Sequence, residues 1–494
     1  MHPTGAASGN TSYVADGAFA NYYGLTEANF SKVTSIGDRA FFYCRSLTNI
    51  SFPEATYIGS SAFQGCSSLT SINFPEVTSI GNNAFYDCSL LANINFPKVT
   101  SIGNEAFYDC SLLANTNFPE VTSIGSAAFY NCKLTNANFP EVTFIGDYAF
   151  QYCTSLTNIS FPKATSIGGY AFQKCYSLIN ISFPKATSIG DYAFQSCRSL
   201  INISFLEATY IGSSAFQYCD LLTSIDFPEA TYIGSNAFYN CSLLTNTNFP
   251  EVTSIGSAAF YNCRSLINAS FPEVSLIENN TFYNCYSLTN ASFPKATSIG
   301  NYAFQNCSSL TDIYFPEVTT IKSSAFLNCD SLISVDFPNV TFIGDYAFAF
   351  CDALTNVNFS KITSIGYAIF STCHSLINVS FPMATYISAS AFYSCDSLTD
   401  INFPEVTTIS SSVFMNCYSL TNASFPKVTS IGMSAFYSCH SLKSLFLTSV
   451  SKVPSLYNAS VFAYTPMSQS SYLGEFGSIY VPSSLYASFI TTAN

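Results

Sequence analysis

A stretch of 22 residues, from position 66 to position 87, decides the fold of this chain. It reads Cys66-Ser-Ser-Leu-Thr-Ser-Ile-Asn-Phe-Pro-Glu-Val-Thr-Ser-Ile-Gly-Asn-Asn-Ala-Phe-Tyr-Asp, and Cys88 begins the next copy. All 19 cysteines of the 494-residue chain follow this spacing, and the only irregular step is the 21 residues from Cys132 to Cys153. Self-similarity at a fixed period of roughly 20–50 residues indicates stacked structural repeats. The sequence therefore predicts a repeat solenoid.

The first half of the repeat contains two short apolar segments. Leu69, Ile72 and Phe74 form the first segment, which is rich in strand-forming residues, and Pro75 ends it because proline cannot donate to a strand ladder. The second segment ends at Ile80, just before a glycine. Both segments predict short strands that stack on their copies in the next coil.

The second half of the repeat runs from the glycine to the next cysteine. Ala84, Phe85 and Cys88 have the spacing that places them on one face of a helical turn, so we expect a short helical turn here. Asn82 and its equivalents are mostly Ser, Asn or Asp. Such side chains can accept hydrogen bonds from the free N–H groups at the start of a helix.

A single coil cannot fold alone, because its few apolar side chains do not offset the ordering entropy of 22 residues. We therefore expect one continuous solenoid over residues 17–447, whose first coil is degenerate. Residues 1–16 are predicted to be a flexible N-terminal segment. Residues 448–494 are predicted to be an atypical capping segment, with a strand near Ile479 and a short helix over 483–490. The 21-residue step should be absorbed in a turn without breaking the stack.

The composition excludes several classes of function. The net charge is −13 with only 16 Lys and Arg residues, whereas nucleic-acid binding needs a basic stripe. Hydrophobic residues make up 48% of the chain, but they are spread along the repeat and no run is long enough to span a membrane. Residues 1–16 show no basic segment followed by an apolar one, so no signal peptide is visible.

The recurring pattern LxxIxFPxVTxIGxxAFxxC resembles the BspA-like (treponemal-type) leucine-rich repeats. The stretch Cys88-Ser-Leu-Leu-Ala-Asn-Ile-Asn-Phe-Pro-Lys-Val-Thr-Ser-Ile-Gly-Asn-Glu-Ala-Phe carries the resemblance well, and it covers about residues 17–447. The resemblance implies a leucine-rich-repeat solenoid of about 20 coils of 22 residues. Its parallel strands would line the concave face, with short helical turns and extended segments on the other side. Members of this family are often surface or secreted proteins of bacteria and parasitic protists, and some bind host matrix proteins. An extracellular or cell-surface location is the corresponding expectation.

The residues that usually carry chemistry point to no enzyme, metal or cofactor. Because each repeat has one cysteine and the total is odd, we interpret the cysteines as free, buried thiols rather than as disulfides or zinc ligands. His374 and His440 occupy the same repeat position three coils apart, so they cannot share a metal, and we interpret them as solvated. No nucleophile–histidine arrangement can be built from three histidines.

The outward positions of the LxxIxF segment are the candidate binding face. They hold an unbroken series of asparagines at Asn93, Asn115, Asn136, Asn158, Asn180 and Asn202. This series suits simple solvation with amide hydrogen bonds between coils, or a neutral binding face. The pattern changes toward the C-terminal half, and the candidate partner-binding residues there are Asp312, Tyr314, Asp336, Asp400, Asn356 and Asn378.

Two functional hypotheses follow. The first is a non-enzymatic binding or adhesion solenoid that presents a concave Asn/Ser/Thr-rich face to a protein or glycan partner, including a host matrix or surface. The alternative is a structural spacer or array component, such as part of a surface layer, a fibre or a phage-like appendage. Variation among solvent-facing positions separates the two, because a spacer needs none whereas a binding face concentrates it.

Overall fold

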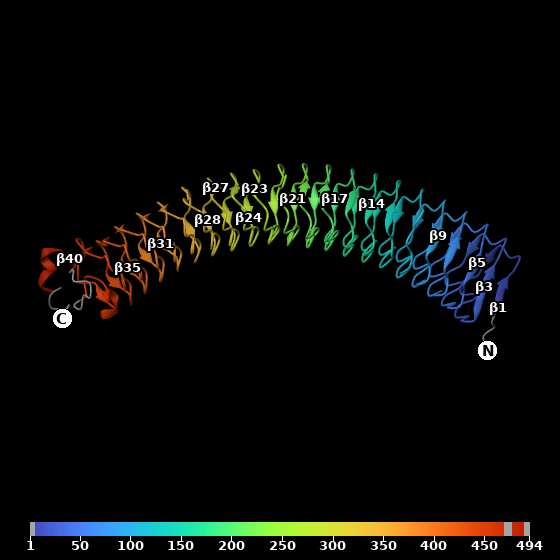
Figure 1. Cartoon of the computed structure of the whole chain (residues 1–494), viewed down its shortest axis with the longest axis horizontal. Coiled ribbons are helices and arrows are strands. Elements are labelled where there is room, and N and C mark those ends of the chain that lie inside the picture. The colour runs from blue at the N-terminus through green and yellow to red at the C-terminus, as the bar shows by residue number, and fades with distance from the viewer. Residues whose placement is uncertain (1–4, 469–476, 489–494) are drawn as a thin grey trace. The chain divides into compact units, whose positions relative to one another are not determined.

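The computed structural model describes residues 5–468 and 477–488, and the chain forms two compact units, residues 1–252 and 253–494. Each unit is a β-solenoid of 22-residue coils in which two ladders of short parallel strands are joined by turns. In Figure 1 the successive coils of the first unit, coloured blue to green, lie beside one another in chain order. The predicted repeat solenoid with parallel strands is confirmed.

The first ladder is built from the strands of the LxxIxF segment. The middle residue of each strand points into the coil, and its two neighbours face solvent, as the exposed–buried–exposed order in Ser71–Asn73 shows. In the first unit its strands are β1 (Gly5–Ser8), β3 (Leu25–Asn29), β5 (Asn49–Ser51), β7 (Ser71–Asn73), β9 (Asn93–Asn95), β12 (Asn136–Asn138), β14 (Asn158–Ser160), β16 (Asn180–Ser182), β18 (Asn202–Ser204) and β20 (Ser224–Asp226). In the second unit they are β23 (Asn268–Ser270), β25 (Asn290–Ser292), β27 (Asp312–Tyr314), β30 (Asn356–Asn358), β32 (Asn378–Ser380), β34 (Asp400–Asn402), β36 (Asn422–Ser424), β38 (Ser444–Phe446) and β40 (Ser478–Tyr480).

The second ladder is built from two-residue strands, most of which end at the isoleucine of the second apolar segment. In the first unit these are β2 (Tyr13–Val14), β4 (Ser35–Ile36), β6 (Tyr57–Ile58), β8 (Ser79–Ile80), β10 (Ser101–Ile102), β11 (Ser123–Ile124), β13 (Phe144–Ile145), β15 (Ser166–Ile167), β17 (Ser188–Ile189), β19 (Tyr210–Ile211) and β21 (Tyr232–Ile233). In the second unit they are β22 (Ser254–Ile255), β24 (Leu276–Ile277), β26 (Ser298–Ile299), β28 (Thr320–Ile321), β29 (Phe342–Ile343), β31 (Ser364–Ile365), β33 (Tyr386–Ile387), β35 (Thr408–Ile409), β37 (Ser430–Ile431) and β39 (Ser455–Leu456). The strands from β2 to β21 pair continuously in one sheet.

The 21-residue step leaves the second ladder and the core stacking intact, although in the first ladder β12 begins a new sheet at this step. Strand β11 pairs with β13 in register, so that Ile124 lies beside Ile145 although the coil between them is one residue short. The core rings of Phe129 and Phe150 stay stacked at 5.3 Å. The missing residue belongs to the turn between Cys132 and the next leucine, both of which remain buried.

The segment from the glycine to the cysteine is not the helical turn that the sequence predicted. In the coil of residues 37–44 the amide of Arg39 donates to the Ser60 carbonyl of the next coil at 2.9 Å, and the amide of Phe41 donates to Ala62 at 2.7 Å. Arg39 and Tyr43 have φ values of 53° and 54°, in the left-handed region. Every second N–H therefore bonds to the neighbouring coil, and successive tight turns replace a helix. The Ala, Phe and Cys residues that were expected to share one face of this segment are buried.

The residue after the glycine also has a different role from the predicted helix cap. The Asn82 side-chain oxygen accepts from the backbone N–H of Asn104, its equivalent in the next coil, at 2.9 Å. Asp191 does the same for Ser213 at 2.7 Å. These side chains therefore join coils, and no helix start is present for them to cap.

The core consists of residue columns that repeat from coil to coil. Two columns of phenylalanines lie side by side, one from the first ladder and one from the turns. Within the turn column, Phe63 and Phe85 stack at 5.3 Å, and Phe74 of the other column lies 6.1 Å from Phe63 at a tilted angle. Because each ring stacks on its own copy, the buried surface of one coil is completed only by its neighbours.

The ends of the array differ in part from the prediction. Strands β1 and β2 pair with β3 and β4, so ladder structure reaches into the segment up to residue 16 that was expected to be flexible. The pairing satisfies backbone groups that would otherwise be left open at the sheet edge. At the other end, β39 and β40 add one strand to each ladder, with 3₁₀ turns at Ala459–Phe462 and Ser483–Leu485. The last two residues of the helix predicted over 483–490 lie outside the described residues.

Candidate partner-binding face

The exposed residues on either side of each buried first-ladder position form the first-ladder face. Two columns run along it, which we call the leading column (before the buried residue) and the trailing column (after it). In the second unit the leading column contains Asn290, Asp312, Ser334, Asn356, Asn378, Asp400 and Asn422. The trailing column contains Ser292, Tyr314, Asp336, Asn358, Ser380, Asn402 and Ser424. All six candidate residues from the sequence therefore lie on one face of the second unit.

Tyr314 is the aromatic departure from the repeat among the coils from Ser292 to Ser424 on this face. Strand β27 pairs with β25 so that Tyr314 lies beside Ser292, and 57% of the tyrosine is exposed. Asp312 lies on the same side of the same strand, and its carboxylate accepts from the hydroxyl of Thr311 at 3.0 Å. Asp336 follows Tyr314 in the trailing column, one coil further along. An exposed aromatic ring thus stands between two exposed carboxylates.

The other three candidate residues bond to neighbouring coils. The Asn378 amide donates to the Asn356 side-chain oxygen at 2.7 Å, and the Asn422 amide donates to the Asp400 carboxylate at 2.6 Å. A partner would have to compete with these bonds or to use the remaining acceptor sites. Asn356, Asn378 and Asp400 are therefore weaker candidates than the cluster around Tyr314.

Sequence reasoning missed the exposed isoleucines beside this face, among them Ile333 and Ile377. Ile333 and Ile377 occupy the position before the leading column, where Thr311, Thr355 and Thr399 stand in neighbouring coils. Their exposed fractions are 55% and 42%. The substitution of isoleucine for threonine was visible in the sequence, but a β-branched apolar residue next to a strand is usually interpreted as core.

The first-ladder face of the first unit is more uniform. The Asn158 amide donates to Asn136 at 3.1 Å, and the Asn180 amide donates to Asn158 at 2.8 Å. These bonds support the interpretation of the asparagine series as hydrogen bonding between coils.

The cysteines form a buried column of free thiols. All 19 are free and buried, and the thiol of Cys66 donates to the Phe41 carbonyl of the preceding coil at 3.2 Å. Burial raises the pKa of Cys44 to about 11 and that of Cys153 to about 12. Among the described residues, no group of three or more His, Cys, Asp or Glu side chains is arranged to hold a metal ion.

The histidines have partners that the sequence analysis did not foresee. His374 Nδ1 lies 2.9 Å from Asp396 Oδ2, in the next coil. The ring of His440 stacks on Tyr418 at 5.2 Å. These residues belong to the column of positions that directly follow the cysteine, and Asp330 lies in the same column. The pKa of Asp330 is raised, mainly by partial burial and to a smaller extent by the negative charge of Asp352.

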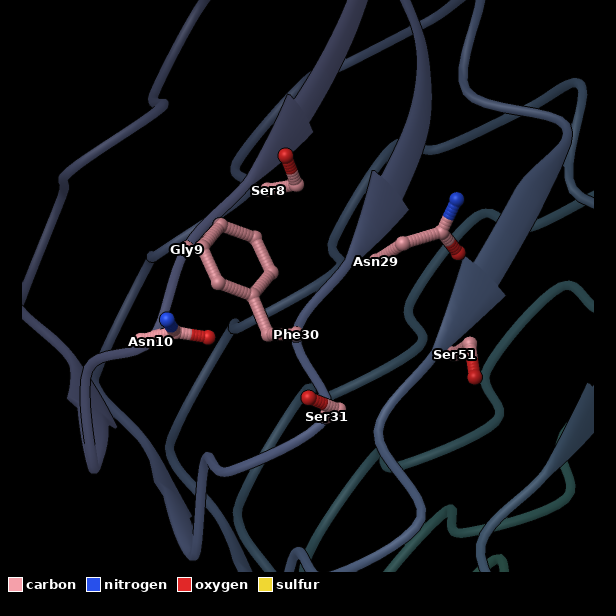
Figure 2. A pocket seen from close by; sticks show the side chains of 7 residues that line it. All are labelled: Ser8, Gly9, Asn10, Asn29, Phe30, Ser31 and Ser51. Carbon is pink, nitrogen blue, oxygen red and sulfur yellow. The ribbon is translucent and has the colours of Figure 1, made fainter.

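A shallow hollow of about 440 Å³ lies in the first coils of the first unit, between the ends of β1, β3 and β5. Figure 2 shows the ring of Phe30 in its centre, beside Gly9 and surrounded by the side chains of Ser8, Asn10, Asn29, Ser31 and Ser51. Ser31 stands where Pro53 and Pro75 follow the phenylalanine in later coils.

No helix within residues 5–468 and 477–488 is long and apolar enough to cross a membrane.

Several bacterial leucine-rich repeat proteins of known structure are similar to this chain. A leucine-rich repeat protein from Bacteroides ovatus is 26% identical, with 80% of this chain and 90% of that chain covered and a TM-score of 0.48. A leucine-rich cell surface protein from Faecalibacterium prausnitzii is 24% identical over 83% of this chain and 82% of its own, with a TM-score of 0.21. The Treponema pallidum leucine-rich repeat protein is 24% identical over 38% and 78% of the two chains, with a TM-score of 0.26. No curated protein matches the chain.

The family assignment rests on the sequence itself. The profile of the BspA type leucine-rich repeat region, which describes six copies, matches residues 12–135, 122–243, 231–355 and 341–469. These matches extend over nearly the whole array, and they confirm the resemblance that the sequence of the repeat indicated. The chain belongs to the BspA-type leucine-rich repeat family.

Proposed function

We propose that the chain is a non-enzymatic binding protein at or outside a cell surface, and that the first-ladder face around Tyr314 binds a protein partner. Leucine-rich repeat proteins of BspA type are generally scaffolds for protein interaction and adhesion. The observation that supports a specific site is the 57% exposure of Tyr314 in a column that holds only Ser, Asn or Asp in the other coils from Ser292 to Ser424.

The chemistry of this cluster favours a basic partner surface. Aromatic anchors contribute a disproportionate share of interface energy, and the carboxylates of Asp312 and Asp336 would steer positively charged residues toward the ring. Ile333, which is 55% exposed, adds apolar area one coil along. The mixture of an aromatic ring, an aliphatic side chain and two carboxylates suits a protein surface better than a neutral glycan.

The hypothesis can be tested with a panel of immobilised, purified extracellular matrix proteins and the full chain in solution. Tyr314→Ala should weaken binding to the partner by about 1–2 kcal/mol, which is roughly a 5- to 30-fold increase in Kd. Asp312→Asn and Asp336→Asn should slow association and reduce its salt dependence.

Asn158→Ala in the first unit is the matched control, because it changes the same face where the residues bond to one another. It should leave binding unchanged. Equal losses at Tyr314 and Asn158, or no binding to any matrix protein on the panel, would contradict the proposal.

The spacer hypothesis is supported by a different observation. The side-chain amides of the first unit form a series of hydrogen bonds between coils, from Asn136 to Asn180. A face whose polar groups already bond to each other needs no ligand. The two functions are compatible, since one unit can extend the array while the other binds.

A further inference from the structure

The second ladder of the second unit opens between strands β29 and β31. Strand β29 ends one sheet and β31 begins the next. On one side of this step the amides of Thr341 and Gly344 donate to the preceding coil at 2.9 and 2.8 Å. Among the described residues, the corresponding amides of Thr363 and Gly366 form no backbone bond to Thr341 or Ile343.

The coils are also further apart at this step. A Cβ placed on Gly366 would lie 3.6 Å from the carbonyl carbon of Gly344, whereas a Cβ on Gly300 would lie 2.6 Å from the carbonyl carbon of Glu278. The core rings of Phe348 and Phe370 are 5.6 Å apart, compared with 5.3 Å for Phe326 and Phe348.

The sequence provides a physical reason for the opening. Ile369 is buried in a column where Ala347 and Ala391 stand in the adjacent coils. Three additional carbon atoms between stacked coils cannot be absorbed by a close-packed interior without displacing a neighbour. Ile369 therefore acts as a wedge that parts the second ladder.

The opening lies beneath a hollow of about 390 Å³ with aromatic walls. Phe342 and Tyr386 occupy the same column two coils apart, with Ser364 between them, and they are 55% and 40% exposed. Tyr367, which is 40% exposed, also lines the hollow and stands where the repeat usually has Ser, Asn or Asp.

This arrangement differs from that of aromatic residues in adjacent coils. Tyr210 and Tyr232 occupy the same column in the first unit, and their rings stack directly on each other at 5.0 Å. Direct stacking leaves no space between the rings. In the second unit, the small Ser364 leaves one coil spacing open between two aromatic side chains.

We propose that the hollow defined by Phe342, Ser364, Tyr367 and Tyr386 is a binding site for one pyranose ring of a glycan. It is independent of the first-ladder face, because it lies on the other ladder of the unit.

The width of the hollow favours a saturated ring. Two strand spacings of about 4.8 Å place the two walls roughly 9.6 Å apart at the backbone, and the wedge adds to this. A flat aromatic guest in contact with both walls would span only about 7–8 Å, given carbon contacts of about 3.5–4.0 Å on each side. A pyranose is thicker because of its pucker and its axial hydrogens, and its C–H faces can pack against aromatic rings.

The rim supplies the polar partners that the edge of a sugar requires. Asp345 Oδ1 accepts from the backbone N–H of Tyr367 at 2.9 Å, and no described residue donates to its Oδ2. Ser364 and Ser388 also line the hollow, whereas the hydroxyl of Tyr386 accepts from the Ser410 hydroxyl of the next coil at 2.8 Å. Aromatic side chains beside several polar groups suit a sugar, because its ring hydroxyls can both donate to the carboxylate and accept from the serine hydroxyls.

The test is saturation-transfer NMR on the full chain with single probes at millimolar concentration. The probes are methyl β-D-galactopyranoside, methyl β-D-glucopyranoside, methyl α-D-mannopyranoside and, as an aromatic alternative, N-acetyltryptophanamide. We expect transfer to the ring C–H protons of at least one sugar. Ser364→Phe should reduce that signal about tenfold, because it fills the space between the walls without removing them.

Three further variants separate the site from general effects on folding. Phe342→Ser and Tyr386→Ser remove one wall each and introduce the most common residue of this column, and both should weaken the signal. Ile369→Ala removes the wedge and should weaken it while the walls stay in place. Tyr57→Ser changes an exposed aromatic of the same column that has serines on both sides, and should have no effect.

The proposal is overturned if none of the three sugars shows transfer, or if Ser364→Phe leaves the transfer unchanged. It is also overturned if only N-acetyltryptophanamide binds, since the occupant would then be an aromatic side chain of a protein. Circular dichroism of each variant establishes that the array is folded, so that loss of signal reports on the site.

Discussion

At the scale of the residue, each position of the repeat is constrained by its own copies in the two adjacent coils. The cysteine column shows this clearly, because a thiol is small enough to fill the space beside the leucine and can donate to a carbonyl group in the preceding coil. The distances from the cysteine sulfur atoms of residues 66, 88 and 110 to those carbonyl oxygens are all 3.2 Å. A serine would donate equally well but would carry a more polar atom into the core.

The first prediction concerns thiol reactivity. Because burial raises the pKa of the cysteines, for example that of Cys44 to about 11, the thiolate population is small at neutral pH. Almost none of the cysteines in the native chain should therefore react with a thiol reagent at pH 7.5. After denaturation all 19 cysteines should react. Titration before and after unfolding measures both values, and a native count near 19, or no free thiols after unfolding, would show that the interpretation is wrong.

The second prediction concerns Asp330, whose pKa is raised by burial and by Asp352. An acid with a native pKa above its unfolded value binds its proton more tightly when folded, so the free energy of unfolding falls as pH rises through the interval between the two values. Asp330→Asn should therefore raise the urea midpoint of unfolding at pH 7. At a pH below the ordinary pKa range of aspartate the carboxyl group is protonated in both states, and the substitution should then give no gain in stability.

Urea unfolding at pH 3.5 and pH 7 measures the effect. Asp220→Asn is the control, because Asp220 occupies the same column but lies 3.6 Å from the guanidinium of Arg198. It should give no gain at pH 7. A gain from Asp330→Asn that is independent of pH would exclude ionisation as the cause.

At the scale of the element, the coil is held by hydrogen bonds that run to both neighbours. The strand amides donate backward, as Thr56 does to Thr34, whereas the turn amides donate forward, as Phe41 does to Ala62. The glycine before the turn is needed for close approach rather than for a left-handed conformation. Its amide bonds to the preceding coil, so that the two backbones are almost in contact.

The third prediction compares two glycines in this position. A Cβ on Gly190 would lie 2.6 Å from backbone atoms of Gly168 and Gly169, whereas on Gly366 the nearest atom would be 3.3 Å away. Gly190→Ala should therefore cost roughly 1–3 kcal/mol through overpacking, and Gly366→Ala should cost clearly less. Thermal unfolding followed by circular dichroism measures the difference. Equal costs at the two positions would show that the neighbouring coil moves aside to admit a side chain at no cost in stability. Lys322 and Ser410 already occupy this glycine position in other coils.

At the scale of the whole molecule, stability is a sum over interfaces between neighbouring coils. The irregular step at Cys132 shows that one missing residue in a turn is tolerated as long as the strands remain in register. The register between the strands of adjacent coils matters more than the exact length of each coil, because every buried side chain must pack on its copy in the next coil.

The fourth prediction uses deletions in the first unit. Removal of residues 176–197 takes out one complete repeat and joins Cys175 to Arg198 with the period preserved, so the array should stay folded. Removal of the 11 residues 187–197 should disrupt it, because strand segments would then meet turn segments and buried faces would be exposed. Limited proteolysis and far-UV circular dichroism distinguish the two. A folded 11-residue deletion would refute the register argument.

The sequence predicted the ladders and the buried columns, because strand periodicity and identical residues at fixed spacing report directly on packing. It did not predict the turn, since Ala84, Phe85 and Cys88 have the same spacing in a helix as in consecutive tight turns. The candidate face could be predicted from the sequence, because Tyr314 and Asp336 replace the Ser or Asn that usually stands at this position of the repeat. The hollow beside Phe342 was not predicted, because it depends on the wedge of Ile369 within the core, and one isoleucine in an alanine column does not reveal which ladder will open.

The stacked tyrosines of the turns give the protein an intrinsic optical signal. The rings of Tyr86, Tyr108 and Tyr130 lie 4.7 and 4.3 Å apart, and those of Tyr148, Tyr170 and Tyr192 lie 4.7 and 4.6 Å apart. Chromophores at this separation couple electronically, and the chain contains no tryptophan to mask them. Near-ultraviolet circular dichroism should therefore display exciton-coupled tyrosine bands that vanish as soon as adjacent coils separate. Spectroscopy without any label can thus follow the overall loss of contact between stacked coils.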